Sequence, residues 1–414
     1  MRFSTYMRSR VLLLGLGLAY VCMGQTTTPA PASDGQKPAD QTPPTPPPAA
    51  LTTPAMTGPL QAMPPATLDA GPFGKLAVNG VLNGLGLWTG NYTPADNSTQ
   101  AGLSNGQVFI QKTDGWFQFY LQAGAYNVVS LGVPYIQTDK TVSNYWGAVP
   151  VAYAKLQAGK NTSFLVGALP TLIGAEYTFS FENMNVSRGL LWGQENAVTR
   201  GVQVNQTFGK FTASISWNDY FYSNRYTAMS GSLAYTNGPH TIAFVGGGNL
   251  GQTAFQTLAT PVQNNSSIYN VIYTYNKGSW VIQPYYQHSS VPTNPKVGVI
   301  KGNSTDGGAI LVNHTFKGGF SLPVRFEYLS SSGSLNDPDV VNLMYGAGSK
   351  ATSFTVTPTY QRGGFFVRGD LSYVHLSDIT PGLGFGQGGT LTSQPRAMAE
   401  FGFIFGHNLI EGKK

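Results

Sequence analysis

"QKTDGWFQFYLQAG", residues 111–124, shows a pattern that recurs along most of this chain. Asp114-Gly115 is a turn signal, because glycine accepts the positive φ that a tight hairpin turn needs. The segment after the turn contains two alternating sets of side chains, Phe117, Phe119 and Leu121 in one and Gln118, Tyr120 and Gln122 in the other. Successive side chains of a strand point to opposite faces, so the segment predicts a β-hairpin with one apolar and one polar face.

Further segments have the same order of strand, glycine turn and strand. They lie at 152–167, 204–217, 233–245, 273–287, 313–328 and 358–373. Long connections rich in Gly, Asn, Ser and Pro separate them, so short and long connections alternate along the chain. Counting the segments in this way predicts about sixteen antiparallel strands over residues 73–407, with both ends of this region at the short-turn rim.

The alternation by itself fits two architectures. In a soluble sandwich the apolar set faces a second sheet, whereas in an outer-membrane barrel it faces lipid and the polar set faces the lumen. Short turns at one rim and long loops at the other favour the barrel. Aromatic residues beside the short turns favour it too, because they suit the boundary between lipid and water. These girdle candidates are Trp116, Phe211, Trp280, Phe320 and Phe365.

We therefore predict an all-β fold, a transmembrane antiparallel up-and-down β-barrel. A barrel of this size encloses a water-filled channel, whereas eight strands are filled by side chains. A soluble secreted sandwich is the alternative.

The first 24 residues are typical of a secretory signal peptide. Three arginines precede an apolar segment from Val11 to Met23, and Cys22-Met23-Gly24 offers a cleavage site. The alternatives are a membrane anchor, which needs roughly 20 apolar residues, and a lipoprotein modified at Cys22. Cleavage removes the only cysteine and three arginines but no acid, which lowers the formal net charge from +6 to +3. Such a surplus gives no argument for nucleic-acid binding, and the mature protein would have no disulfide.

Residues 25–72 differ in composition, because prolines crowd this stretch and it contains no aromatic residue. Such a segment buries too little apolar surface to offset the entropy of ordering it. We predict a disordered periplasmic tether, with binding to a partner or to the cell wall as the alternative. The last residues, 408–414, form a short basic tail.

Charged residues of the predicted strands share the parity of the polar set. Arg or Lys facing lipid near the membrane midplane would cost about 2–4 kcal/mol, so we expect these side chains inside. The pore-lining candidates are Lys155, Arg325, Glu327, Arg368, Asp370, Arg396 and Glu400. Either they only hydrate and cross-pair the wall, or Arg325, Arg368 and Arg396 form a basic strip near the narrowest point that favours anions.

The third long connection, "PTLIGAEYTFSFENMNVSRGLLWG" at 170–193, interrupts the strand pattern. Pro170 cannot continue a central strand. The apolar residues that follow are too many for a solvated loop: Leu172, Ile173, Tyr177, Phe179 and Phe181. We predict that the connection folds into the barrel, with Glu176, Glu182 and Arg188 as constriction candidates opposite the wall arginines. A loop over the outer mouth and a disordered loop are the alternatives.

The same connection resembles a segment of the outer-membrane porin family called beta-barrel porin-2. The matching residues are Ile173-Gly174-Ala175-Glu176, then Asn183-x-Asn185-x-Ser187-Arg188, then Leu190-Leu191. The resemblance is expected to extend from about Phe73 to His407, and it implies an outer-membrane pore.

Pattern and resemblance together predict a porin of the bacterial outer membrane, a water-filled channel for passive diffusion of small hydrophilic solutes. Its expected partners are outer-membrane lipid and those solutes, and large porins often form a homotrimer. We predict no cofactor and no metal site, and we read Asp337 and Asp339 as turn residues rather than Ca²⁺ ligands.

Two other functions remain open. A surface adhesin or receptor would use the long outer loops. A barrel-embedded hydrolase is disfavoured, because the five histidines lie far apart and in no nucleophile or metal motif. We therefore predict no enzymatic activity.

Overall fold

The computed structural model describes residues 53–56, 58–94, 96–253 and 261–407. The predicted signal peptide (1–24), the first part of the predicted tether (25–52) and the predicted tail (408–414) lie outside these residues.

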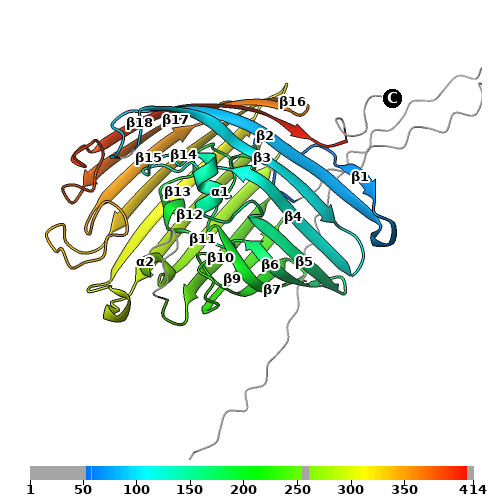
Figure 1. The fold of residues 1–414 in the computed structure, drawn as a ribbon, viewed down its shortest axis with the longest axis horizontal. Helices are drawn as coiled ribbons and strands as arrows, with labels where there is room; N and C mark the ends of the chain where they lie inside the picture. The colour runs from blue at the N-terminus through cyan, green and yellow to red at the C-terminus, as the bar shows by residue number, and fades with distance from the viewer. Residues whose placement is uncertain (1–52, 57, 95, 254–260, 408–414) are drawn as a thin grey trace, which may run out of the picture.

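Over the described residues one antiparallel sheet closes into a barrel of 16 strands, which confirms the predicted fold (Figure 1). Each strand pairs with the next, and β2 (Lys75–Thr89) closes the ring by pairing with β18 (Ser393–Phe405). The strands between them are β3 (Thr99–Lys112), β4 (Phe117–Tyr126), β5 (Val151–Ala158), β6 (Thr162–Pro170), β7 (Val198–Phe208), β8 (Phe211–Asn218), β9 (Ala228–Asn237), β10 (His240–Asn249), β11 (Ser267–Lys277), β12 (Trp280–Val291), β13 (Asn303–Thr315), β14 (Phe320–Ser331), β15 (Lys350–Val356), β16 (Thr359–Arg362) and β17 (Phe365–Asp378).

Three short strands depart from the regular pattern. β15 and β16 both pair with β14 and β17, so they are two parts of one spanning strand that is interrupted at Thr357-Pro358. β1 (Ala66–Asp69) is an additional short strand that pairs with the start of β2. The turn between them contains the 3-10 helix η1 (Gly71–Phe73).

The remaining helices are short and lie in the long connections. α1 (Thr138–Asn144) follows β4, α2 (Pro261–Asn264) follows β10, and the 3-10 helix η4 (Pro295–Val297) follows β12. The connection after β6 contains η2 (Ser180–Glu182) and η3 (Leu191–Gln194). In the part of the chain that the structure describes, no helix is long and apolar enough to cross a membrane.

The two faces of the sheet follow the predicted alternation. In β14, Arg325 and Glu327 are fully buried inside the barrel, whereas Phe326 is 48% exposed on the outside. A one-residue slip would move the charged pair to the lipid face, so the cost of a charge in lipid fixes this register. At the short turns Gly209 and Gly363 have a φ of 58°, which the hairpins require.

The predicted disordered tether is wrong for its final part. Residues 53–56 and 58–65, which we call the strap, pack against the inside of the barrel before the chain enters β1. Met56 and Leu60 are 4% and 1% exposed, in a cluster with Val81 and Phe366. The composition argument fails here because the strap needs no core of its own and uses that of the barrel.

Candidate functional site in the barrel lumen

The connection between β6 and β7, residues 171–197, folds into the barrel as predicted, and we call it the inserted loop. Its side chains Ile173, Phe179 and Phe181 are at most 2% exposed. Phe179 and Phe181 stack with their ring centroids 5.8 Å apart, and Phe181 also contacts Phe109 of β3 at 5.5 Å. Each such side chain contributes roughly 1.5–3 kcal/mol through burial, which explains why the loop does not stay in solvent.

An ion pair joins the inserted loop to β14. The carboxylate of Glu176 lies 2.5 Å from the guanidinium of Arg325, and both side chains are fully buried. Glu176 also accepts hydrogen bonds from the backbone N–H of Gly189 at 2.8 Å and from the Asn183 amide at 3.1 Å. The carboxylate of Glu327 accepts the backbone N–H of Leu190 at 3.0 Å. A charge removed from water needs such partners.

A second set of contacts joins the loop to β17 and β18. Arg368 donates to the backbone carbonyls of Ser180 at 2.8 Å and of Asn183 at 3.1 Å. It also lies 3.4 Å from Glu400, which accepts a 2.6 Å hydrogen bond from the Ser180 hydroxyl. Asp370 accepts the backbone N–H of Val186 at 2.9 Å. The wall therefore holds the backbone of the loop as well as its side chains.

Arg188 of the loop and Arg396 of the wall both contact a second inward connection, the one that follows β4. The backbone of Arg188 pairs with this connection, because its N–H donates to Val129 at 2.9 Å and its carbonyl accepts from Leu131 at 2.9 Å. Arg396 of β18 donates to the carbonyls of Ser130 at 2.7 Å and of Val133 at 3.1 Å. Both connections are thus fixed inside the barrel.

These contacts bring together most of the charged residues predicted from the sequence. All except Lys155, Glu182 and Arg396 lie in one buried layer between the inserted loop and the wall, and Arg396 is buried against the connection after β4. An open basic strip was one of the two alternatives for the wall charges, but Arg325, Arg368 and Arg396 are at most 3% exposed, because the two connections cover them. The predicted girdle residues all lie outside, between 38% and 73% exposed.

The strap crosses the lumen at the short-turn end. The Gln111 amide of β3 donates to the carbonyl of Thr53 at 2.7 Å. At its other end Gln61 and Gln361 of β16 exchange two hydrogen bonds, at 2.7 and 2.9 Å. The backbone N–H of Ala55 donates to the Glu182 carboxylate at 3.1 Å, so the strap also contacts the inserted loop.

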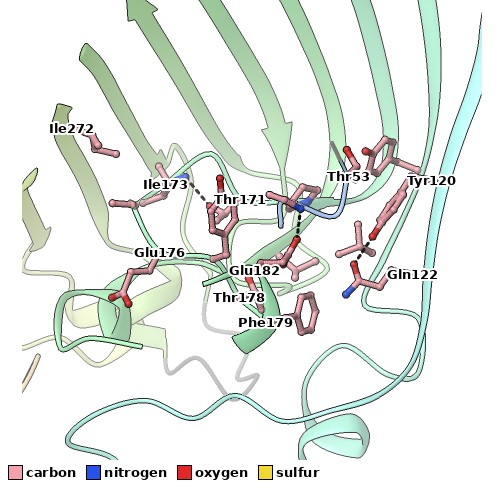
Figure 2. A pocket seen from close by; sticks show the side chains of 18 of the residues that line it. Thr53, Tyr120, Gln122, Thr171, Ile173, Glu176, Thr178, Phe179, Glu182 and Ile272 are labelled. Carbon is pink, nitrogen blue, oxygen red and sulfur yellow. Dashed lines mark hydrogen bonds between the residues drawn. The ribbon is translucent and has the colours of Figure 1, made fainter. Parts of the chain in front are cut away.

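A cavity of about 320 Å³ lies between the inserted loop, the strap and the wall (Figure 2). Tyr120, Gln122, Tyr153 and Gln283 line it from β4, β5 and β12, and Glu182 lines it from the loop. A second cavity of about 230 Å³ shares Thr53, Tyr120 and Tyr153 with the first and is also lined by Lys112 and Lys155. Tyr120 belongs to the polar set predicted for its strand, and Tyr153 shares the parity of Lys155, but neither tyrosine was among the predicted pore-lining candidates.

Glu182 lies outside the loop–wall layer and differs from Glu176, Glu327 and Glu400, which each lie beside an arginine. It faces the cavity and is partly exposed there, and desolvation by the surrounding protein raises its pKa to about 7. The backbone N–H groups of Ala55 and Phe179 and the charge of Arg188 counteract only part of this effect. Near neutral pH the carboxyl is therefore partly protonated.

The sequence of this chain matches the family described as "Putative beta-barrel porin-2, OmpL-like" over residues 75–405. The chain belongs to this family. It is a β-barrel porin of the outer membrane, which confirms the predicted resemblance, location and channel function. Family and fold point to a channel rather than an enzyme. No curated protein is significantly similar to the chain in sequence.

Solved outer-membrane proteins have the same fold. OmpT of Vibrio cholerae has a TM-score of 0.53 and 12% identity, over 80% of this chain and 98% of that one. The outer-membrane channel DcaP of Acinetobacter baumannii has a TM-score of 0.52 and 10% identity, over 79% and 97%. OmpF of Salmonella typhi, solved with daunomycin, has a TM-score of 0.50 and 13% identity, over 80% and 98%. At these identities the likeness concerns the fold.

Proposed function

We propose that this porin lets small hydrophilic solutes diffuse passively along a path between the inserted loop and the wall of β4, β5 and β12. The two adjoining cavities that share Thr53, Tyr120 and Tyr153 carry this proposal. They extend from the level of the loop toward the short turns, where Lys112 and Lys155 lie. The path is lined by amides, hydroxyls and charged groups, which can replace part of the hydration of a polar solute.

In this proposal the inserted loop forms the constriction. Glu176 and Arg188 hold the loop in position, and Glu182 faces the path of the solute. The anion preference predicted from Arg325, Arg368 and Arg396 loses its basis, because these arginines are covered. The charged side chains that line the larger cavity are Glu176, which is neutralised by Arg325, and Glu182. We infer a preference for cations at this level, because an acid beside a narrow path lowers the energy of a cation there.

Single-channel recording in planar bilayers tests the channel function. The folded porin should give ohmic current steps in KCl. Correctly folded protein without steps would contradict the proposal and would favour the adhesin or receptor alternative.

We also propose that the porin acts without a catalytic role and assembles as a homotrimer in lipid. A solved form of the Vibrio cholerae OmpT is a trimer, which supports the analogy. Light scattering of the detergent-solubilised protein should give three times the mass of one chain, and a monomer mass would exclude the trimer.

A further inference from the structure

We infer that the lumen cavity of about 320 Å³ binds a small solute that carries an ammonium group, with Glu182 as the anionic partner of that group. The inference rests on the proposed passage of solutes through this cavity, and it adds the chemical class of solute that binds there.

Glu182 carries a charge that no arginine or lysine of the described residues pairs with. Glu176, Glu327 and Glu400 each lie within 3.4 Å of an arginine guanidinium. Glu182 accepts a single backbone hydrogen bond from the strap, and among the described residues it forms no ion pair. A carboxylate enclosed by protein without a cationic partner is stabilised when a ligand supplies the cation.

Aromatic rings line the same cavity as Glu182. Tyr120 and Tyr153 line the same cavity, with ring centroids 5.6 Å apart and an interplanar angle of 33°. The hydroxyl of Tyr120 donates to Gln122 at 2.9 Å, which fixes the ring (Figure 2). Phe179 adds a third ring on the loop side. Aromatic faces attract an ammonium group through their quadrupole, whereas they give an anion no such stabilisation.

The volume of the cavity and the positions of the nearby lysines also fit a small ammonium solute. The volume of about 320 Å³ is at the lower end of the range for small-molecule sites. It equals roughly ten water molecules at about 30 Å³ each, enough for a short-chain amine. Within the described lining no lysine or arginine faces this cavity, and Lys112 and Lys155 line the neighbouring one. These lysines lie on the side toward the short turns. Lys112 is paired there with Asp114, so Lys155 is the charge that opposes onward movement of a cation.

The test uses 1,4-diaminobutane as the probe, with 1,4-butanediol as a neutral analogue and succinate as an anion of similar length. Isothermal titration calorimetry of the folded porin in detergent should show binding of the diamine only. Glu182→Gln should weaken this binding at least tenfold, and Tyr153→Leu should weaken it about threefold, in line with a cation–π contribution of 0.5–1 kcal/mol.

Glu195→Gln is the matched control. Glu195 is a second buried acid of the inserted loop, and it does not line the cavity. Its replacement should leave diamine binding unchanged. Unfolding in urea should confirm that the variants are folded.

The outcomes separate this inference from the proposed function. Equal binding of diamine and diol, or an unchanged affinity in Glu182→Gln, would overturn the inference even if the porin conducts. Diamine binding without any current in bilayers would contradict the proposed function and leave the amine site standing.

Discussion

The inserted loop and the strap both occupy the lumen, but different forces hold them. The loop is bound through buried arginines and carboxylates such as Arg325 and Glu176, which are 2.5 Å apart. The strap is bound mainly through hydrogen bonds with the uncharged side chains of Gln111 and Gln361, through one backbone hydrogen bond to Glu182, and through burial of Met56 and Leu60. Removing the loop would take away the partners of several wall charges, such as Arg325, whereas removing the strap would free one acceptor on Glu182. We infer that the loop constricts the lumen permanently, whereas the strap obstructs the lumen but can leave it.

The largest effect is expected from Arg325→Ala. This change leaves the carboxylates of Glu176 and Glu327 buried without their cation, so the free energy of unfolding should fall by about 3–5 kcal/mol. Urea unfolding followed by tryptophan fluorescence measures it. Lys155→Ala is the matched control, because this half-buried lysine lies outside the layer and should cost about 0.5 kcal/mol or less. Equal losses in both variants would mean that the buried layer does not hold the loop.

Deleting residues 53–65 should have its main effect on current. Three cavities, of about 380, 310 and 230 Å³, lie beside the strap at the short-turn end. They should merge when the strap is absent, so single-channel conductance should increase roughly twofold. The urea midpoint should change far less than in Arg325→Ala. An unchanged conductance would show that the strap does not obstruct the path.

Ion selectivity should depend on pH through the carboxyl of Glu182, the point at which the strap contacts the inserted loop. The pKa of Glu182 is about 7, so its charge is present at pH 8 and largely lost at pH 6. Cation preference should decline over this range, because Tyr120 and Tyr153 are neutral and Arg188 is charged throughout. The ordinary carboxyl pKa is 4.5, so the folded state retains this proton more tightly, and stability should fall as pH rises from 4.5 to about 7. A Glu182→Gln variant whose selectivity still varies with pH would contradict the assignment.

The smallest effect is expected from Gln361→Ala. This change removes the two hydrogen bonds to Gln61, each with a net contribution of about 0.5–1.5 kcal/mol at most, because the pair is exposed. The strap should then leave its position more often, which single-channel recording would detect as added current noise. Gln206→Ala, in which the lost partner is Thr162 of the neighbouring strand, should add none. Equal noise in both variants would remove the link to the strap.

Much of the fold could be predicted from the sequence, because alternation and turn glycines are local signals. The inward face of Arg325 and Glu327 follows from their parity alone. The inserted loop was predictable as well, since Phe179 and Phe181 need a core. The partners were not, because Glu176 and Arg325 are 149 positions apart and only barrel closure brings them together.

The strap was missed for a physical reason. Its prolines indicate an extended chain, but composition does not reveal whether an extended chain lies in solvent or across a barrel. Met56 and Leu60 were the available signal, four residues apart on a proline-rich stretch. Burial of the wall arginines was missed in the same way, because parity places a side chain inside without showing what covers it.

The reversal potential in a KCl gradient tests the central claim, that the loop shapes a path whose open charge is Glu182. At pH 8 the porin should prefer K⁺ to Cl⁻, Glu182→Gln should abolish most of that preference, and Glu195→Gln should retain it. A preference for Cl⁻ in the unaltered porin, or an unchanged reversal potential in Glu182→Gln, would contradict the account.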